Sequence, residues 1–185
     1  MATTISFPTA VNDPSSTNAD NAFADDGTLT DLIYDSDSDI TWSSFSSLSI
    51  PAGATINGIE IVAEGIGKTL ANKPDMSVYN GTSWSSALAM NGTFGRAPAT
   101  FDPAWGSSSN LWGLAWNATT AAGIQIKSDN STVGSLRSWA VDYLKVRITY
   151  TAAAGYGHDV NGVAAANIGK VNGVATADIS KVIGV

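Results

Sequence analysis

The chain has 185 residues, a net charge of −7, one histidine and no cysteine, a size that suits one domain with short appendages. Only 14% of the residues are charged, so the chain lacks the basic surface that nucleic acid or anionic membranes require. Without cysteine there is no disulfide or thiolate chemistry, and a single histidine excludes multi-histidine metal sites. No basic-then-apolar leader or long apolar run occurs, so we expect a soluble protein without a signal peptide.

Uncharged polar residues dominate the composition. The chain contains 22 serines, 18 threonines and 18 glycines, which dilute the residues that favour helices. Many turns and few helix formers are typical of antiparallel β-sandwiches and barrels. We therefore predict an all-β protein, an antiparallel jelly-roll-like sandwich.

The first segment, residues 1–28, contains turn-forming residues too often to predict a regular element. We interpret it as an extended N-terminal arm whose apolar anchors are Ile5, Phe7 and Phe23. The next segment, residues 29–50, alternates loosely between apolar and polar positions and predicts two short strands around an acidic turn.

The first clear strand is Ile56–Glu64, which is rich in β-branched residues and follows a Pro-Ala-Gly turn. Met76–Tyr79 is a second strand candidate. Asn80-Gly81 comes directly after it and predicts a hairpin with a type I′ turn that leads to Trp84, because Asn-Gly accepts the positive φ angles of that turn.

Residues 91–110 are rich in Gly, Pro and Ser and are interpreted as a long loop. Apolar segments resume at residues 111–116 and 123–127. The strongest strand signal is residues 139–150, where apolar residues occupy every second position from 144 to 150 and Lys145 and Arg147 alternate with them. This strand closes a predicted sandwich domain of residues 29–150.

Residues 151–185 form a linker and a tail with an 11-residue repeat, which occurs at Val160–Lys170 and Val171–Lys181 and partly at Val182–Val185. Each full repeat contains Asn-Gly, which argues against a helix and predicts a tight turn between short Val-rich strands. Two such repeats are too small to bury a core of their own. We therefore expect the tail to pack on the main domain or on other subunits, as an assembly element.

Asp35, Asp37 and Asp39 have the spacing of the start of an EF-hand loop. The rest of the loop does not match, because Ile40 stands where the loop needs glycine and Ser46 where it needs glutamate. A calcium site of another kind and a solvated acidic turn both stay open for these carboxylates.

Enzyme motifs are absent from the sequence. It has no nucleophile elbow, P-loop, dinucleotide fingerprint or zinc-protease motif, and His158 has no nucleophile motif to serve. Motifs do not exclude a hydrolase of the two-carboxylate kind, which needs only Asp and Glu. We expect a protein that is not an enzyme, with no catalytic residue, no cofactor and no metal.

Six tryptophans are many for so lightly charged a chain. Trp84, Trp105, Trp112 and Trp116 lie in or beside predicted loops and are candidates for a platform on which a glycan stacks. The alternative is packing in the core or between subunits, where an aromatic ring buries a large area.

Three segments resemble tailed-bacteriophage virion proteins that share the pattern IP-x-GATI-x-GIEV, LWG and VD-h-h-x-V-x-h-x-Y. They are Ile50–Ile61, Leu111–Trp116 and Val141–Thr151. The Val-Asn-Gly-Val repeat also looks like tails of phage structural proteins. The resemblance covers residues 48–185, and its motifs are structural, so it carries over no catalytic residue.

The resemblance implies a structural component of the virion, assembled in the bacterial cytoplasm. A capsid decoration or cement protein is the first expectation, and a tail fibre or receptor-binding module that contacts host glycans is the second. The expected partners are further copies of the chain, as a family-level trimer, and the major capsid protein or other virion proteins. The expected assembly contacts are apolar residues at the two ends of the chain: Ile5, Phe7, Phe23, Val160, Val163, Ile168, Val171, Val174, Ile179 and Val182.

Overall fold

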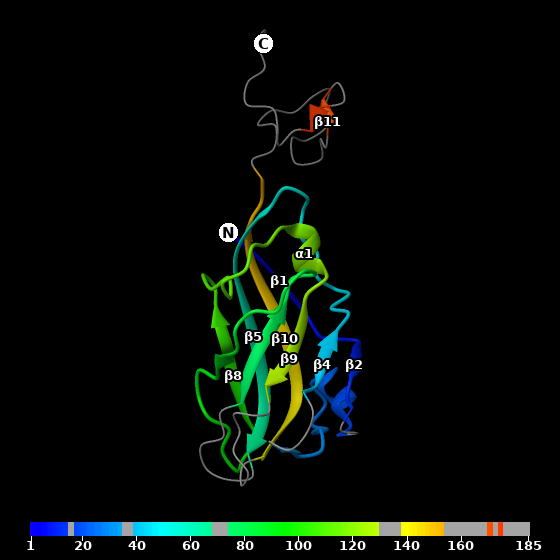
Figure 1. The fold of residues 1–185 in the computed structure, drawn as a ribbon, viewed down its shortest axis with the longest axis vertical. Coiled ribbons are helices and arrows are strands. Elements are labelled where there is room, and N and C mark those ends of the chain that lie inside the picture. The colour runs from blue at the N-terminus through cyan, green and yellow to red at the C-terminus, as the bar shows by residue number, and fades with distance from the viewer. Residues whose placement is uncertain are drawn as a thin grey trace.

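A computed structural model of the protein describes residues 1–14, 17–34, 39–67, 74–129, 138–153, 170–171 and 174–175. Two antiparallel β-sheets pack face to face (Figure 1), which confirms the predicted all-β sandwich. The first sheet, sheet A, has the order β1-β10-β5-β8, and β3 also pairs with β10. Its strands are β1 (Ala2–Ser6), β3 (Ile33–Tyr34), β5 (Thr55–Gly67), β8 (Ala99–Ser107) and β10 (Ser138–Thr151).

The second sheet, sheet B, has the order β2-β4-β9-β6-β7. Its strands are β2 (Ala10–Asn12), β4 (Thr41–Ser43), β6 (Asp75–Tyr79), β7 (Leu88–Ala89) and β9 (Gln125–Asp129). Two short helices, η1 (Ala19–Ala22) and α1 (Ala118–Ala122), lie in connections.

The long strands β5 and β10 pair antiparallel and form the centre of sheet A. The period-2 pattern predicted for β10 is confirmed from 144 to 148, because Leu144, Val146 and Ile148 are fully buried and Lys145 and Arg147 between them are partly exposed. The pattern was also expected to place Thr149 outward, but Thr149 is buried next to a register shift. Alternation places these two sets of side chains on opposite faces of the sheet. The inner set packs against sheet B.

Aromatic rings fill the space between the sheets. The Phe94 ring stacks on Trp139 with centroids 6.3 Å apart, and it meets the Trp105 ring edge-on at 6.4 Å. Buried indole N–H groups usually find an acceptor, although that of Trp139 has none among the described residues. Trp42 Nε1 donates to Ala19 O at 2.9 Å, and Trp105 Nε1 donates to Pro74 O at 2.9 Å.

The prediction of a separate N-terminal arm is wrong. β1 pairs with β10, with Ala2 opposite Tyr150, and β2 pairs with β4. Residues 1–28 thus supply a strand to each sheet. The sequence did not predict these two strands, because each is short and is followed by turn-forming residues. Their pairing partners also lie far away in the sequence.

The prediction of one long loop over residues 91–110 is also wrong, because β8 lies within it. β8 is an edge strand, and its register against β5 shifts between Ile61 and Ala63. Pro103 lies in that bulge, where a strand tolerates a residue without an N–H donor. In contrast, residues 111–116 form turns, with positive φ angles at Trp112 and Gly113.

The hairpin predicted after β6 is confirmed, because Tyr79 and Trp84 form an antiparallel bridge. Its turn differs from the predicted type I′. The positive φ angle, +89°, belongs to Gly81 alone, and Asn80 instead accepts hydrogen bonds at its side-chain oxygen from the N–H groups of Thr82 and Ser83, at 3.0 and 2.9 Å. Asn80 therefore acts as an Asx-type cap of the turn.

Part of the tail is described. β11 (Lys170–Val171) pairs antiparallel with β12 (Val174–Ala175), with Val171 opposite Val174. Two short strands thus lie on either side of the second Asn-Gly pair, as predicted, and the first of them begins at the last residue of the first repeat. The other predicted assembly contacts of the tail lie outside the described residues: Val160, Val163, Ile168, Ile179 and Val182.

Candidate functional site

The outer face of sheet B carries an exposed aromatic group. We call the part of this outer face around Trp84 the Trp84 face. The antiparallel register places Tyr79 opposite Gln125, and Ser77 opposite Lys127, so these side chains share one face of the sheet. The face is defined by seven residues of β4, β6, β9 and the hairpin: Thr41, Ser43, Ser77, Tyr79, Trp84, Gln125 and Lys127.

Trp84 is 37% exposed and is held by two neighbours. Its ring lies 5.2 Å from the Tyr79 ring at an interplanar angle of 36°. The Lys127 ammonium lies 5.2 Å from the centre of the Trp84 ring, within the range of a cation–π interaction. Lys127 in turn pairs with Asp39 at 3.1 Å. The indole is therefore fixed in position while part of it faces solvent.

The hairpin that presents Trp84 is anchored at its turn. Besides capping the turn, Asn80 donates from its side-chain nitrogen to Ala115 O at 3.0 Å. The Ser85 hydroxyl accepts from the N–H of Val78 at 3.0 Å, and the Ser85 N–H donates to Val78 O at 2.8 Å. These bonds tie the hairpin to β6 and to the loop before α1.

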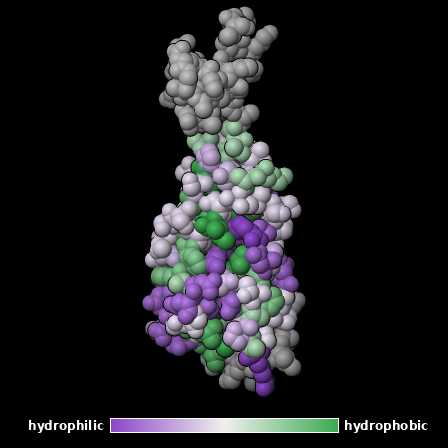
Figure 2. Space-filling model, turned by 180° about the vertical axis from the view of Figure 1, so that it is seen from behind, coloured by the Kyte–Doolittle hydropathy of each residue, from purple (hydrophilic) through white to green (hydrophobic). Residues whose placement is uncertain are grey.

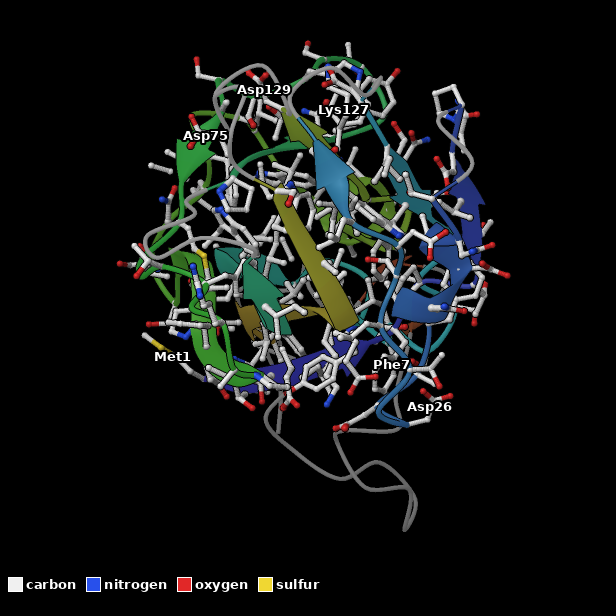
Figure 3. The ribbon with its side chains drawn as sticks, turned by 90° about the horizontal axis from the view of Figure 1, so that it is seen from below. Met1, Phe7, Asp26, Asp75, Lys127 and Asp129 are labelled. Carbon is white, nitrogen blue, oxygen red and sulfur yellow. The ribbon has the colours of Figure 1, made fainter. Side chains whose placement is uncertain are left out.

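Carboxylates and one described ammonium group border the Trp84 face. Asp75 on β6 lies directly opposite Asp129 on β9, and Asp39 pairs with Lys127. Viewed along the sandwich (Figure 3), Asp75, Lys127 and Asp129 lie on one side, and Met1, Phe7 and Asp26 on the other.

The predicted platform of four tryptophans does not exist in this structure. Trp105 is fully buried and Trp112 is 5% exposed, and the Trp112 indole donates to Ile59 O at 2.9 Å. Both belong to the core, which corrects their prediction as glycan contacts. Trp116 is half-buried and donates to Leu111 O at 2.9 Å. Only Trp84 lies on a sheet face with its ring exposed, and Tyr79, Gln125 and Lys127 are neighbours that sequence reasoning missed.

The predicted N-terminal anchors are mostly used within the domain. The Phe7 ring meets the Tyr143 ring edge-on at 6.1 Å. Phe23 forms a bridge with Tyr143 and packs against the core. Their prediction as contacts that reach past the domain is therefore corrected. Ile5 is 47% exposed on β1 and remains on the surface.

The outer face of sheet A carries a charged network. Arg147 Nε donates to Glu60 at 2.8 Å, and the two terminal nitrogens of Arg147 donate to Asp102. These hydrogen bonds raise the pKa of Arg147 above its usual range. Hydrophilic and hydrophobic residues alternate over the side seen in Figure 2, without one continuous apolar patch. We interpret the network as structural, since it joins β5, β8 and β10.

Asp142 is a buried acid on β10. It is 3% exposed, and burial raises its pKa above the usual value of 3.8, although hydrogen bonds from the backbone of Asp26 and Gly27 act in the opposite direction. Its Oδ1 has no hydrogen-bond partner within the described chain. Burial thus makes the charged form of this carboxyl group less favourable than in water, and the backbone of residues 26–27 offsets part of that cost.

The carboxylates considered for calcium are separated or lie outside the described residues. Asp39 pairs with Lys127, and Asp35 and Asp37 are not among the described residues. Where the structure describes the chain, no group of three or more metal-ligating side chains occurs. In the same ranges, none of the helices has the length and apolar character needed to span a membrane.

No protein-family model matches the chain, and no curated protein matches it significantly.

Proposed function

We propose that this protein is a non-enzymatic structural component of a bacteriophage virion, a capsid decoration or cement protein. The observation that carries the proposal is the β11–β12 hairpin formed by the tail repeat. A two-stranded hairpin this short is at best marginally stable alone. A partner surface would supply the burial that it lacks, and other copies of the chain or the major capsid protein are the partners we propose.

The resemblance to phage virion proteins supports the same function. Two of the three resembling segments, Ile50–Ile61 and Val141–Thr151, meet in β5 and β10, where Ile61 lies opposite Val146. They thus form the structural centre of sheet A. A component that binds only the assembled shell stabilises it by mass action.

The test is the molar mass of the protein in solution, measured by light scattering for the full chain and for a variant that lacks residues 155–185. We expect a stable oligomer for the full chain and a folded monomer for the truncated one. Cosedimentation with capsid shells then tests the second partner. A full chain that is monomeric and does not cosediment with shells contradicts the proposal.

A receptor-binding module of the tail, which contacts host-surface glycans, is the second candidate function. The exposed Trp84 on the outer face of sheet B favours it. Copy number separates the two candidates, because decoration of a shell needs hundreds of copies per virion and a tail appendage needs a few tens or fewer.

A further inference from the structure

The two ends of the sandwich differ in charge. The upper end in Figure 1 contains the start of β1, the start of β5, the residues after β8 and the end of β10. We call it the uncharged end and define it as residues 1–4, 48–57, 107–116 and 149–153. None of these residues is Asp, Glu, Lys or Arg, so all 16 acidic and 9 basic residues of the chain lie elsewhere. Apart from the amino group of Met1, this end carries no charge.

Hydrogen bonds join the four ranges into one surface. Three of them link one range to another or to the adjoining part of β5: Ser49 N to Thr4 Oγ1 at 3.2 Å, Asn57 Nδ2 to Thr151 Oγ1 at 2.9 Å, and Ile59 N to Asn110 O at 2.9 Å. The surface is therefore held together by the domain before any partner binds, which lowers the cost of ordering it in a contact.

The uncharged end exposes apolar side chains beside hydroxyl groups. Leu111 is 36% exposed and lies outside the core, and Pro51 and Ala52 are exposed in the turn before β5. Exposed hydroxyls at the same end belong to Thr3, Ser49, Thr55, Ser108, Ser109 and Thr151. Strongly hydrophilic residues lie in the middle and lower parts of Figure 2, and the upper end of the sandwich is mostly pale or green on that side. A protein interface has this composition, with few charges and some apolar area.

Charge favours a second copy of the chain as the partner. The tail contains two acidic and two basic residues, which balance, so the net charge of −7 falls within residues 5–148. Copies that approach one another through these acidic parts repel each other. The uncharged end avoids that repulsion. Each hydroxyl there also both donates and accepts hydrogen bonds, so it can pair with the same kind of group in another copy.

The tail continues from the same end of the sandwich. β10 ends at Thr151, and the first repeat begins nine residues later, at Val160. Nine residues span at most about 30 Å. Copies that are joined through their tails therefore keep their uncharged ends close together and their charged parts farther apart.

We propose that the uncharged end is the surface through which copies of this chain contact one another, with Leu111 and the turn at Ala52 in the contact. The inference rests on the proposed function, and it assigns part of the contact between copies to the sandwich in addition to the tail.

The test adds like charges to this surface. In the full chain, Ala52→Asp combined with Leu111→Asp places two carboxylates per copy at the uncharged end. We expect the dissociation constant of the oligomer, measured by light scattering over a concentration series, to rise about tenfold or more.

The matched control is Ala24→Asp combined with Ala97→Asp. It adds the same charge at exposed positions outside the uncharged end, one after η1 and one before β8, and it should leave the dissociation constant unchanged. The thermal unfolding midpoint of each variant shows whether it is folded.

A mixture identifies the partner. Ala52→Lys combined with Leu111→Lys should weaken the oligomer as well, because the copies again carry like charges. A mixture of the Asp variant and the Lys variant should associate more strongly than either variant alone, since opposite charges then meet. Such recovery requires one copy to face another.

The outcomes separate the inference from the proposed function. An oligomer whose stability is the same in the Asp variant overturns the inference and keeps the proposed function, with the tail joining the copies. A mixture that associates no better than its components also overturns the inference. A full chain that is monomeric does so too, and cosedimentation with capsid shells then decides the proposed function.

Discussion

The ammonium group of Lys145 lies 3.9 Å from the centre of the Tyr143 ring, two residues earlier on the same strand. It also lies 4.7 Å from the centre of the Phe7 ring and 3.2 Å from Asp25 Oδ2. One side chain thus joins β10 to the segment after β1 and to the loop after η1. This cluster adds side-chain contacts between β10 and the N-terminal residues to the backbone pairing of β1 with β10.

We expect Lys145→Met to lower the free energy of unfolding by about 1–2 kcal/mol, because it removes one partly buried cation from two rings and one carboxylate while it keeps the alkyl chain. Urea unfolding measures the change. Arg96→Met, at an exposed position, is the matched control and should change the free energy by less than about 0.5 kcal/mol. Equal effects of the two substitutions would show that the contacts of Lys145 with Tyr143, Phe7 and Asp25 do not stabilise the fold.

Gly58→Ala should destabilise the protein by about 3 kcal/mol. The added Cβ would lie 2.2 Å from the backbone carbon of Ser108. Ser108 follows directly after β8, so the backbone cannot move away without disturbing the pairing of β5 with β8. Gly95→Ala is the control, since nothing lies within 4 Å of its added Cβ, and its effect should stay under about 1 kcal/mol. Thermal or urea unfolding of both variants checks this. Similar stabilities would mean that residues 108–109 do not cover Gly58.

Arg147→Met should lower the free energy of unfolding by about 2 kcal/mol, because it leaves Glu60, whose side chain is 8% exposed, without its cationic partner. Adding Glu60→Gln should recover part of the loss, since an amide is less costly to bury than a carboxylate. A double-mutant cycle from urea unfolding measures the coupling. Strictly additive losses would contradict a direct interaction between the two side chains.

Asp142 should give the stability a pH dependence of known sign. Since burial raises its folded-state pKa, the folded protein holds this proton to a higher pH than the unfolded chain does. The resulting stabilisation is complete below the unfolded-state pKa and is lost as the pH rises through the folded-state pKa. Asp142→Asn stays neutral throughout, so its unfolding midpoint should rise relative to that of the parent protein as the pH increases from about 3 to 7. Parallel midpoint curves would show that the folded-state pKa is not raised.

The sequence predicted those parts of the fold in which local pattern and tertiary role agree. The alternation of β10 and the β-branched content of β5 reflect one buried face, and both strands lie where they were expected. In contrast, β1 gains its strand structure from a partner at the other end of the chain, with Ala2 opposite Tyr150. No local pattern carries that information.

The tryptophans show the same limit for the candidate site. Trp105 and Trp112 lie among glycines, prolines and serines, a context that indicates surface loops. Their indole N–H groups instead find acceptors in Pro74 and Ile59, which are distant in sequence, so both rings can be buried. Trp84 was predicted as a ligand contact, but its neighbours Gln125 and Lys127 come from a strand about 40 residues later, and only the register of β6 and β9 brings them together.

The position of β10 has a mechanical consequence. The tail continues from the end of this strand, and β10 is hydrogen-bonded to β1 on one side and to β5 on the other. A pull on the tail along the strand axis therefore loads both rows of backbone hydrogen bonds in shear. Many of these hydrogen bonds must then break together. A hairpin that is pulled apart at its ends instead opens one hydrogen bond at a time. The pairing of β10 on both sides therefore favours resistance to a pull along the strand axis over the stepwise opening of a single hairpin.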